Sequence, residues 1–94
     1  MKSNNEVQES HGTVIVPEKR QWRERAVVAA INLAQRFQSD ILFCAGSFCI
    51  DAKSSLMAMM MLGALKGQLL ELTARGTDSV QALRELTLAF EAQR

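Results

Sequence analysis

The sequence contains too few of the reactive residue types to build several familiar sites. Its 94 residues include one histidine, His11, and two cysteines, Cys44 and Cys49. Two cysteines are too few for a disulfide framework, and together with one histidine they fall short of a zinc site. We therefore expect reduced thiols, no metal and no cofactor.

Excess charge of one sign and long apolar runs are also lacking. Lysine and arginine total 11 and aspartate and glutamate total 10, which gives a formal net charge of +1. This balance provides no overall attraction to nucleic acid or to a membrane surface. No apolar run near the N-terminus is long enough for a signal peptide or a membrane span. We expect a cytoplasmic protein without a membrane partner, and we disfavour a nucleic-acid partner.

The length limits the architecture to one small domain. With 94 residues, 48% of them hydrophobic, the chain can bury one modest core but not a second. Residues 1–11 are mostly polar, so we expect a flexible extension there, followed by a domain at residues 12–94. His11 ends this extension, where a lone histidine is far more often solvated than a ligand or a catalyst.

The spacing of apolar residues predicts the element order β-α-β-β-α-β-α. Strands are expected at residues 13–16, 41–44, 48–50 and 70–74. Helices are expected at residues 23–38, within residues 53–67, and after Asp78, which resembles a capping box with Gln81. This order predicts an α+β domain in which three helices cover one face of a four-stranded antiparallel sheet.

Two of the predicted strands are close enough in sequence to form a hairpin. A turn at Gly46 and Ser47 would place Cys44 opposite Cys49 in adjacent strands. A cross-strand disulfide is usually strained, whereas cysteine packs well as a small apolar residue. We therefore expect two packed, reduced cysteines here rather than a disulfide.

The helix within residues 53–67 is almost wholly apolar. It starts with serines that suit an N-cap and stops at a Lys-Gly pair that suits a C-cap. Four of the five methionines lie in it and occupy several of its faces, so part of this surface should be exposed. An exposed methionine patch suits docking to more than one partner. The alternative is that most of these methionines fill the core.

The start of this helix has a second property. No aspartate or glutamate lies between Lys53 and Lys66. The first-turn amides and the positive end of the helix dipole would therefore favour a phosphate on Ser54 or Ser55. A plain serine cap without modification is the alternative.

These segments resemble a known family. Residues 51–57 (Asp-Ala-Lys-Ser-Ser-Leu-Met) and 62–67 (Leu-Gly-Ala-Leu-Lys-Gly) are similar to the second-helix region of HPr, the histidine-containing phosphocarrier of the bacterial sugar phosphotransferase system. The similarity extends from about Thr13 to Phe90. It implies the HPr fold, an open-faced β-sandwich, which agrees with the element order.

The same resemblance indicates that the active histidine is missing. Members of the family carry a Gly-x-His-Ala-Arg-Pro-Ala type motif, and residues 23–27 align with its His-Ala-Arg-Pro-Ala part, so that Arg23 replaces the histidine and only Arg25 matches. Guanidinium is always protonated and only donates, so Arg23 cannot accept a phosphoryl group. Glu24 and Ala26 also depart from the motif. The two arginines could hold an anion or a partner's carboxylate, or they could form a solvated turn.

The family also has a regulatory serine and a partner surface. The serine starts the second helix and is phosphorylated by a dedicated kinase in some bacteria; the equivalent is Ser55, or Ser54 if the alignment is counted from Lys53. The residues that the resemblance places on the partner surface are Arg23, Arg25, Ala29, Asn32, Leu56, Met57 and Met60.

The leading hypothesis is an HPr-like protein that is not an enzyme, is inactive in phosphotransfer at the usual position, and acts as a regulatory or adaptor protein. The implied partners are proteins of the phosphotransferase system or a transcriptional regulator, and an HPr-type serine kinase. One alternative is a phosphocarrier with an unusual acceptor such as His11. The other is a small nucleic-acid binder that uses Lys19, Arg20, Arg23, Arg25 and Arg36. The glutamates interspersed among these basic residues argue against it.

Overall fold

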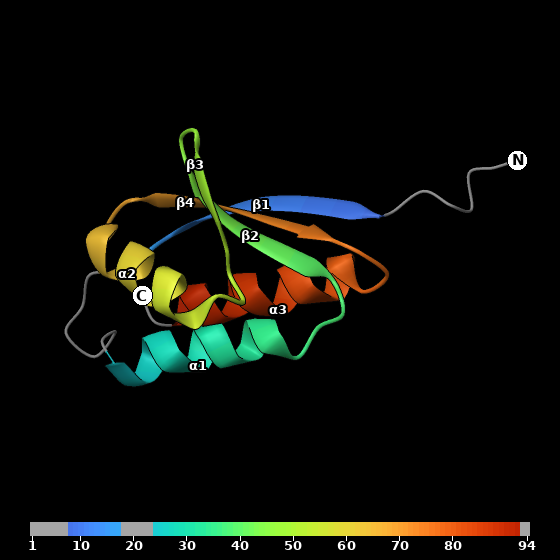
Figure 1. Cartoon of the computed structure of the whole chain (residues 1–94), viewed down its shortest axis with the longest axis horizontal. Coiled ribbons are helices and arrows are strands. Elements are labelled where there is room, and N and C mark those ends of the chain that lie inside the picture. Colours follow the sequence, from blue (N-terminus) through green and yellow to red (C-terminus); the bar gives the residue numbers. More distant parts are fainter. Residues whose placement is uncertain (1–7, 18–23, 93–94) are drawn as a thin grey trace, which may run out of the picture.

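The computed structural model describes residues 8–17 and 24–92, and the elements in them follow the predicted order (Figure 1). The strands are β1 (Glu9–Ile15), β2 (Asp40–Ala45), β3 (Phe48–Asp51) and β4 (Leu69–Arg75). The helices are α1 (Glu24–Gln35), α2 (Ser55–Ala64) and α3 (Ser79–Ala92). The predicted fold class is confirmed.

The strands form one antiparallel sheet in the order β1-β4-β2-β3. The three helices lie on one side of it, as expected (Figure 1). α3 packs directly on β1 and β4, whereas α1 packs on α2 and α3. The other face of the sheet is left open, and β1 and β3 form its two edges.

The first strand begins earlier than the sequence suggested. β1 pairs with β4 from Glu9 opposite Arg75 onward, so residues 9–11 belong to the sheet and not to an N-terminal extension. Polar composition concealed this half of the strand, because its outward side chains meet solvent and its inward ones are small. A Cβ on Gly12 would meet the Leu83 side chain at 3.4 Å, which shows how closely α3 approaches. The expected flexibility of residues 1–7 concerns positions outside the described residues.

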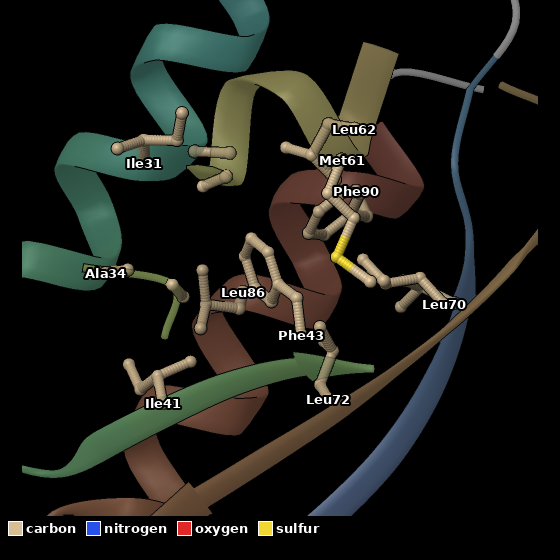
Figure 2. Close-up of a cluster of buried hydrophobic side chains, with 14 of the residues drawn as sticks. Ile31, Ala34, Ile41, Phe43, Met61, Leu62, Leu70, Leu72, Leu86 and Phe90 are labelled. Atoms are coloured by element: carbon tan, nitrogen blue, oxygen red, sulfur yellow. The ribbon is translucent and has the colours of Figure 1, made fainter. Parts of the chain in front are cut away.

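The core fills the space between the sheet and the helices (Figure 2). Phe43 of β2 and Phe90 of α3 meet edge to face with ring centroids 6.1 Å apart. Leu62 of α2 and Leu72 of β4 are fully buried around them. α2 is therefore anchored to the same core that α3 and the sheet share.

The predicted capping box at the start of α3 was wrong. The Asp78 carboxylate accepts hydrogen bonds from the amides of Gln38 at 2.8 Å and Ser39 at 2.9 Å, and from the Ser39 hydroxyl. Gln81 donates to Glu85 instead. The hydroxyl of Ser39 and the amide of Gln38 hold the pKa of Asp78 below its usual range. Asp78 thus ties the α1–β2 connection to α3, and α1 ends at Gln35 and not at the predicted residue 38.

Candidate functional site

The start of α2 is built on β3 and its exit turn. The Asp51 carboxylate accepts a hydrogen bond from the Lys53 amide at 2.9 Å, and the Asp51 carbonyl accepts one from the Ser54 amide at 2.9 Å. Ser54 is the N-cap residue, but its hydroxyl makes no capping hydrogen bond within the described helix. Ser54 and Ser55 are both exposed. The two serines thus present accessible hydroxyls at a helix start whose first turn contains no acid.

Lys53 fixes the position of α2 relative to α1. Its Nζ donates to the Phe37 carbonyl at 2.7 Å, and its own carbonyl accepts a hydrogen bond from Gln35 Nε2 at 2.9 Å. These two bonds join the end of α1 to the start of α2. The exposed sides of the two helices are therefore held in a defined arrangement.

The helix α2 is apolar on its outward side as well as on its inward side. Ala58, Met61 and Leu62 face the core. Leu56 is 69% exposed and Met60 is 65% exposed, and the remaining two helix methionines are exposed too. The expectation of an exposed methionine surface is confirmed. Of the four methionines in α2, Met61 is the one that is buried in the core.

An apolar groove runs between α2 and the β2–β3 hairpin, with a volume of about 250 Å³. Phe48, 56% exposed, forms its wall on the hairpin side. The groove is lined by Ala45, Phe48, Met57, Met60, Met61, Ala64 and Leu65. Sequence reasoning missed Phe48 and Ala45 as parts of this surface; an aromatic residue directly after a two-residue turn was the available signal.

The predicted partner surface is only partly within the described side chains. Leu56, Met57 and Met60 lie on the exposed side of α2. Ala29 and Asn32 are exposed and one turn apart on α1, which packs against α2. The structure thus places these five residues on two adjoining helices.

Of the two arginines of the predicted site, Arg25 alone lies within the described residues. Arg23, the expected equivalent of the phosphohistidine, lies outside the described residues, as do Lys19 and Arg20 of the nucleic-acid alternative. Arg25 lies in the first turn of α1. The predicted anion-holding role of this segment stays a prediction.

The two cysteines form a disulfide, so the expectation of reduced thiols was wrong. Gly46 has a φ of 61°, which allows the tight turn, and Cys44 pairs directly with Cys49 as predicted. Their Cα atoms are 4.1 Å apart and their sulfurs are bonded at 2.05 Å. Such a short Cα separation is typical of a non-hydrogen-bonded antiparallel pair, in which the side chains lie close together. Because the two cysteines lie directly opposite each other on the same face of the hairpin, they form a disulfide and do not remain as packed thiols.

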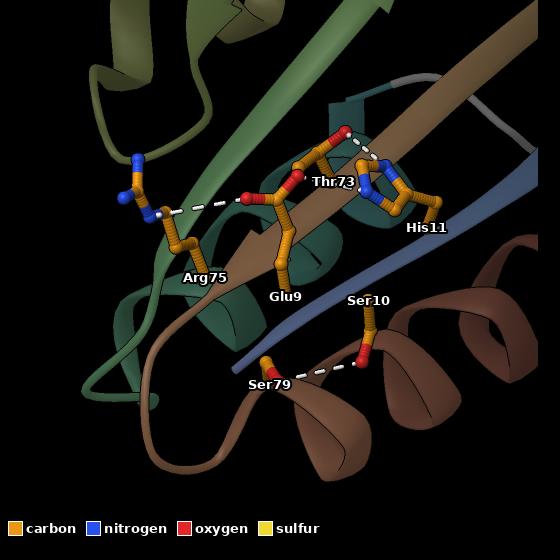
Figure 3. Close-up of polar contacts among 6 residues, drawn as sticks. All are labelled: Glu9, Ser10, His11, Thr73, Arg75 and Ser79. Atoms are coloured by element: carbon orange, nitrogen blue, oxygen red, sulfur yellow. Dashed lines mark hydrogen bonds and ion pairs between the residues drawn. The ribbon is translucent and has the colours of Figure 1, made fainter. Parts of the chain in front are cut away.

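His11 lies on the open face of the sheet (Figure 3). Its Nε2 is 2.8 Å from Glu9 Oε2 and its Nδ1 is 3.2 Å from Thr73 Oγ1. The neighbouring Ser10 points to the other side of β1, where its hydroxyl is 3.4 Å from that of Ser79 on α3. His11 and the helices are therefore on opposite faces of the sheet.

The described part of the chain lacks two further features. Within residues 8–17 and 24–92, no group of three or more His, Cys, Asp or Glu side chains is arranged to hold a metal ion. No helix in the described part of the chain is both long enough and apolar enough to cross a membrane.

Comparisons with known proteins agree on one family. A family model described as the phosphorylation site of the PTS HPr component matches residues 11–92. The phosphocarrier protein HPr of Neisseria meningitidis serogroup A is 37% identical over 54 residues, which cover 57% of this chain and 60% of that protein. The phosphocarrier protein NPr of Klebsiella oxytoca is 26% identical over 80 residues, 85% of this chain and 89% of that protein.

Solved structures support the same assignment. HPr-C-His from Thermoanaerobacter tengcongensis is 26% identical, with a TM-score of 0.78 over 89% of this chain and 93% of its own. Crh, the Bacillus subtilis catabolite repression HPr, is 28% identical, with a TM-score of 0.64 over 86% of this chain and 95% of its own. From the match over residues 11–92 and the shared fold, we conclude that this chain belongs to the HPr family of the phosphotransferase system.

Proposed function

We propose that this protein is a regulatory or adaptor member of the HPr family that docks other proteins but does not relay phosphate at the usual histidine position. The observation that carries the proposal is the exposed apolar surface of α2 with the groove beside it. Leu56 and Met60 are mostly exposed although they lie on a helix anchored in the core. Apolar side chains gathered in this way mark a surface that another protein covers.

The absence of a suitable acceptor supports the second half of the proposal. The sequence contains a single histidine, His11, and the family resemblance assigns the phosphohistidine position to Arg23. A guanidinium group has no free lone pair with which to accept a phosphoryl group. The protein therefore lacks the chemistry of a carrier at that position.

His11 is a poor substitute for the missing histidine. It stands on the open face of the sheet, whereas a partner docked on α2 would be on the helical side. Its Nε2 is next to the Glu9 carboxylate at 2.8 Å, so a phosphoryl group there would meet a negative charge. The alternative of a carrier that uses His11 is disfavoured by both features.

The partner class follows from the family. The surface formed by Ala29, Asn32, Leu56, Met57 and Met60, to which the family resemblance adds Arg23 and Arg25, would bind an apolar patch with acidic groups at its rim. Proteins of the phosphotransferase system and transcriptional regulators are the proposed partners. The family also includes Crh, which is described as a catabolite repression HPr, and this similarity supports the regulatory part of the proposal.

A serine switch at the start of α2 fits this role. Ser55 is the proposed phosphorylation site and Ser54 is the second choice, with an HPr-type serine kinase as the enzyme. Both residues are exposed and adjoin Leu56 and Met57 of the docking surface. A phosphate there would be favoured by the helix dipole and would add charge to the edge of an apolar interface.

Intact-protein mass spectrometry with two phosphate donors tests the proposal. One sample receives enzyme I and phosphoenolpyruvate, with an ordinary HPr as positive control, and the other receives the HPr serine kinase and ATP. We expect no acid-labile phosphate in the first sample and a stable phosphate in the second, which Ser55→Ala abolishes and Ser54→Ala leaves. Acid-labile phosphate on this chain would contradict the proposal. A stable phosphate that Ser54→Ala alone removes would move the switch to Ser54.

A further inference from the structure

The disulfide of the β2–β3 hairpin is unequally accessible at its two sulfurs. Cys44 lies in an interior strand and is 6% exposed, whereas Cys49 lies in the edge strand and is exposed. Thiol–disulfide exchange requires an incoming thiolate to reach one sulfur while the other leaves. The edge position of Cys49 therefore determines which sulfur is attacked.

We propose that Cys44–Cys49 is a thiol–disulfide exchange site whose substrate is a dithiol reductant. A thiolate of the reductant attacks Cys49 Sγ, the bond to Cys44 Sγ breaks, and Cys44 leaves as a thiolate that takes up a proton. The second thiolate of the reductant then attacks the reductant's first sulfur, which is bonded to Cys49 Sγ in the mixed disulfide, and Cys49 is released as a thiolate. The dithiol loses two electrons and becomes a disulfide, and the two cysteines gain those electrons and two protons.

Acidic groups beside the disulfide determine which charge around the reductant's thiol favours the reaction. On the open face, Cys44 is paired across the strands with Glu71 of β4, and Asp51 lies two residues beyond Cys49 on the same side of β3. Both acids are exposed. Their negative charge opposes an incoming thiolate and a developing thiolate on Cys44. A reductant with basic residues around its reactive thiol should therefore act faster than an acidic one.

Reduction should change the groove without unfolding the domain. The disulfide joins cysteines with a sequence separation of 5 and so closes a short loop, which constrains the unfolded chain less than a long one. The core lies on the opposite face of the sheet, between the strands and helices. Reduction removes the covalent bond between β2 and β3, and β3 is an edge strand of four residues.

The groove wall is adjacent to this bond. Phe48 precedes Cys49 in the chain and is paired across the turn with Ala45, and both residues line the groove. Breaking the disulfide removes the covalent bond next to Phe48 and leaves the backbone pairing with Ala45 and the contacts across the groove to hold it. This consequence rests on the proposed docking function: a reduced hairpin would present a less ordered wall to the partner, and docking would weaken.

Mapping the mixed disulfide tests which sulfur reacts. The oxidised full chain is incubated with a limiting monothiol such as glutathione at neutral pH, quenched with acid, and analysed by peptide mass spectrometry. We expect the adduct on Cys49 at about ten times the level on Cys44, because access controls the attack. An adduct mainly on Cys44, or a disulfide that dithiothreitol reduces only after the fold is denatured, would overturn the proposal.

Single variants provide a second readout. Cys44→Ser leaves a thiol at the exposed position and Cys49→Ser leaves one at the buried position, and circular dichroism establishes that both variants are folded. The thiol of Cys44→Ser should react with an aromatic disulfide reagent about ten times faster than that of Cys49→Ser. Glu71→Gln should accelerate reduction of the otherwise natural chain by about two- to threefold at low salt, with the difference shrinking at high salt. Equal reactivity of the two thiols would overturn the assignment of Cys49.

Docking of the oxidised chain and of a Cys44→Ser/Cys49→Ser variant separates this inference from the proposed function. We expect the double variant to bind enzyme I a few-fold more weakly. If the oxidised chain does not bind a partner while Cys49 still forms the adduct, the docking function fails and the exchange site stands. If both forms bind equally, the effect of the disulfide on the groove is refuted.

Discussion

Truncating Met60 should weaken docking while leaving the fold intact. Complete burial of a methionine side chain is worth about 1.5–3 kcal/mol. Because 65% of Met60 is exposed in the free protein, roughly 1–2 kcal/mol of that burial remains to be gained when a partner covers it. Met60→Ala should therefore lower the affinity by about 5- to 30-fold, since 1.4 kcal/mol corresponds to tenfold.

Isothermal titration of the variant with enzyme I and with the HPr serine kinase would measure this loss. The matched control is Val80→Ala, since Val80 is also largely exposed, at 58%, but lies in the first turn of α3, at the far end of that helix from α2 (Figure 1). The control should bind as the natural chain does. Thermal unfolding should show little change for either variant, because both side chains are mostly solvated. If Met60→Ala bound both partners as tightly as the natural chain, the reasoning about this surface would be refuted.

Three further substitutions test the core position of Leu62, the hydrogen bonds of Asp78 and the role of His11. Leu62→Ala, at a fully buried position of α2, should reduce the free energy of unfolding by about 2–5 kcal/mol in denaturant titrations; an unchanged midpoint would contradict the placement of α2 in the core. Asp78→Asn should lower the melting temperature at neutral pH. Because the folded pKa of Asp78 lies below its unfolded value, its stabilisation is present above the unfolded pKa and is lost as the pH falls through the folded pKa, so the variant and the natural chain should converge in acid. His11→Gln should leave the phosphate gained from the serine kinase unchanged. If the natural chain gained acid-labile phosphate from enzyme I and His11→Gln did not, His11 would be identified as an acceptor.

Periodicity was sufficient to predict the elements with strong apolar patterns. The strand around Leu72 and the last helix with Leu86 were predicted because each has a buried stripe with the right spacing, and the strand around Phe43 was predicted from a short continuous apolar run. The polar first half of β1 was missed, since pairing with β4 and not apolar composition makes it a strand. Local pattern therefore predicts the core better than it predicts the edges of the sheet.

The missed contacts depend on residues far apart in sequence. Asp78 resembled a cap by its spacing to Gln81, but its carboxylate instead binds backbone amides near residue 39, about forty positions earlier. Leu56 and Met60 of the proposed docking surface were predicted from the family resemblance and from the apolar excess of α2. The aromatic residue after the two-residue turn was a local signal for Phe48, but the groove itself depends on how the hairpin packs beside α2, which the local sequence does not encode.

A competition assay tests at once whether this chain keeps the docking surface of the family and whether it lacks the phosphoryl acceptor. Enzyme I, phosphoenolpyruvate and an ordinary HPr are mixed with increasing amounts of this chain, and the phosphate on each protein is followed by intact mass. Our account predicts that phosphorylation of the ordinary HPr slows as this chain is added, while this chain gains no acid-labile phosphate. Acid-labile phosphate on this chain, or phosphorylation of the ordinary HPr at an unchanged rate, would contradict it.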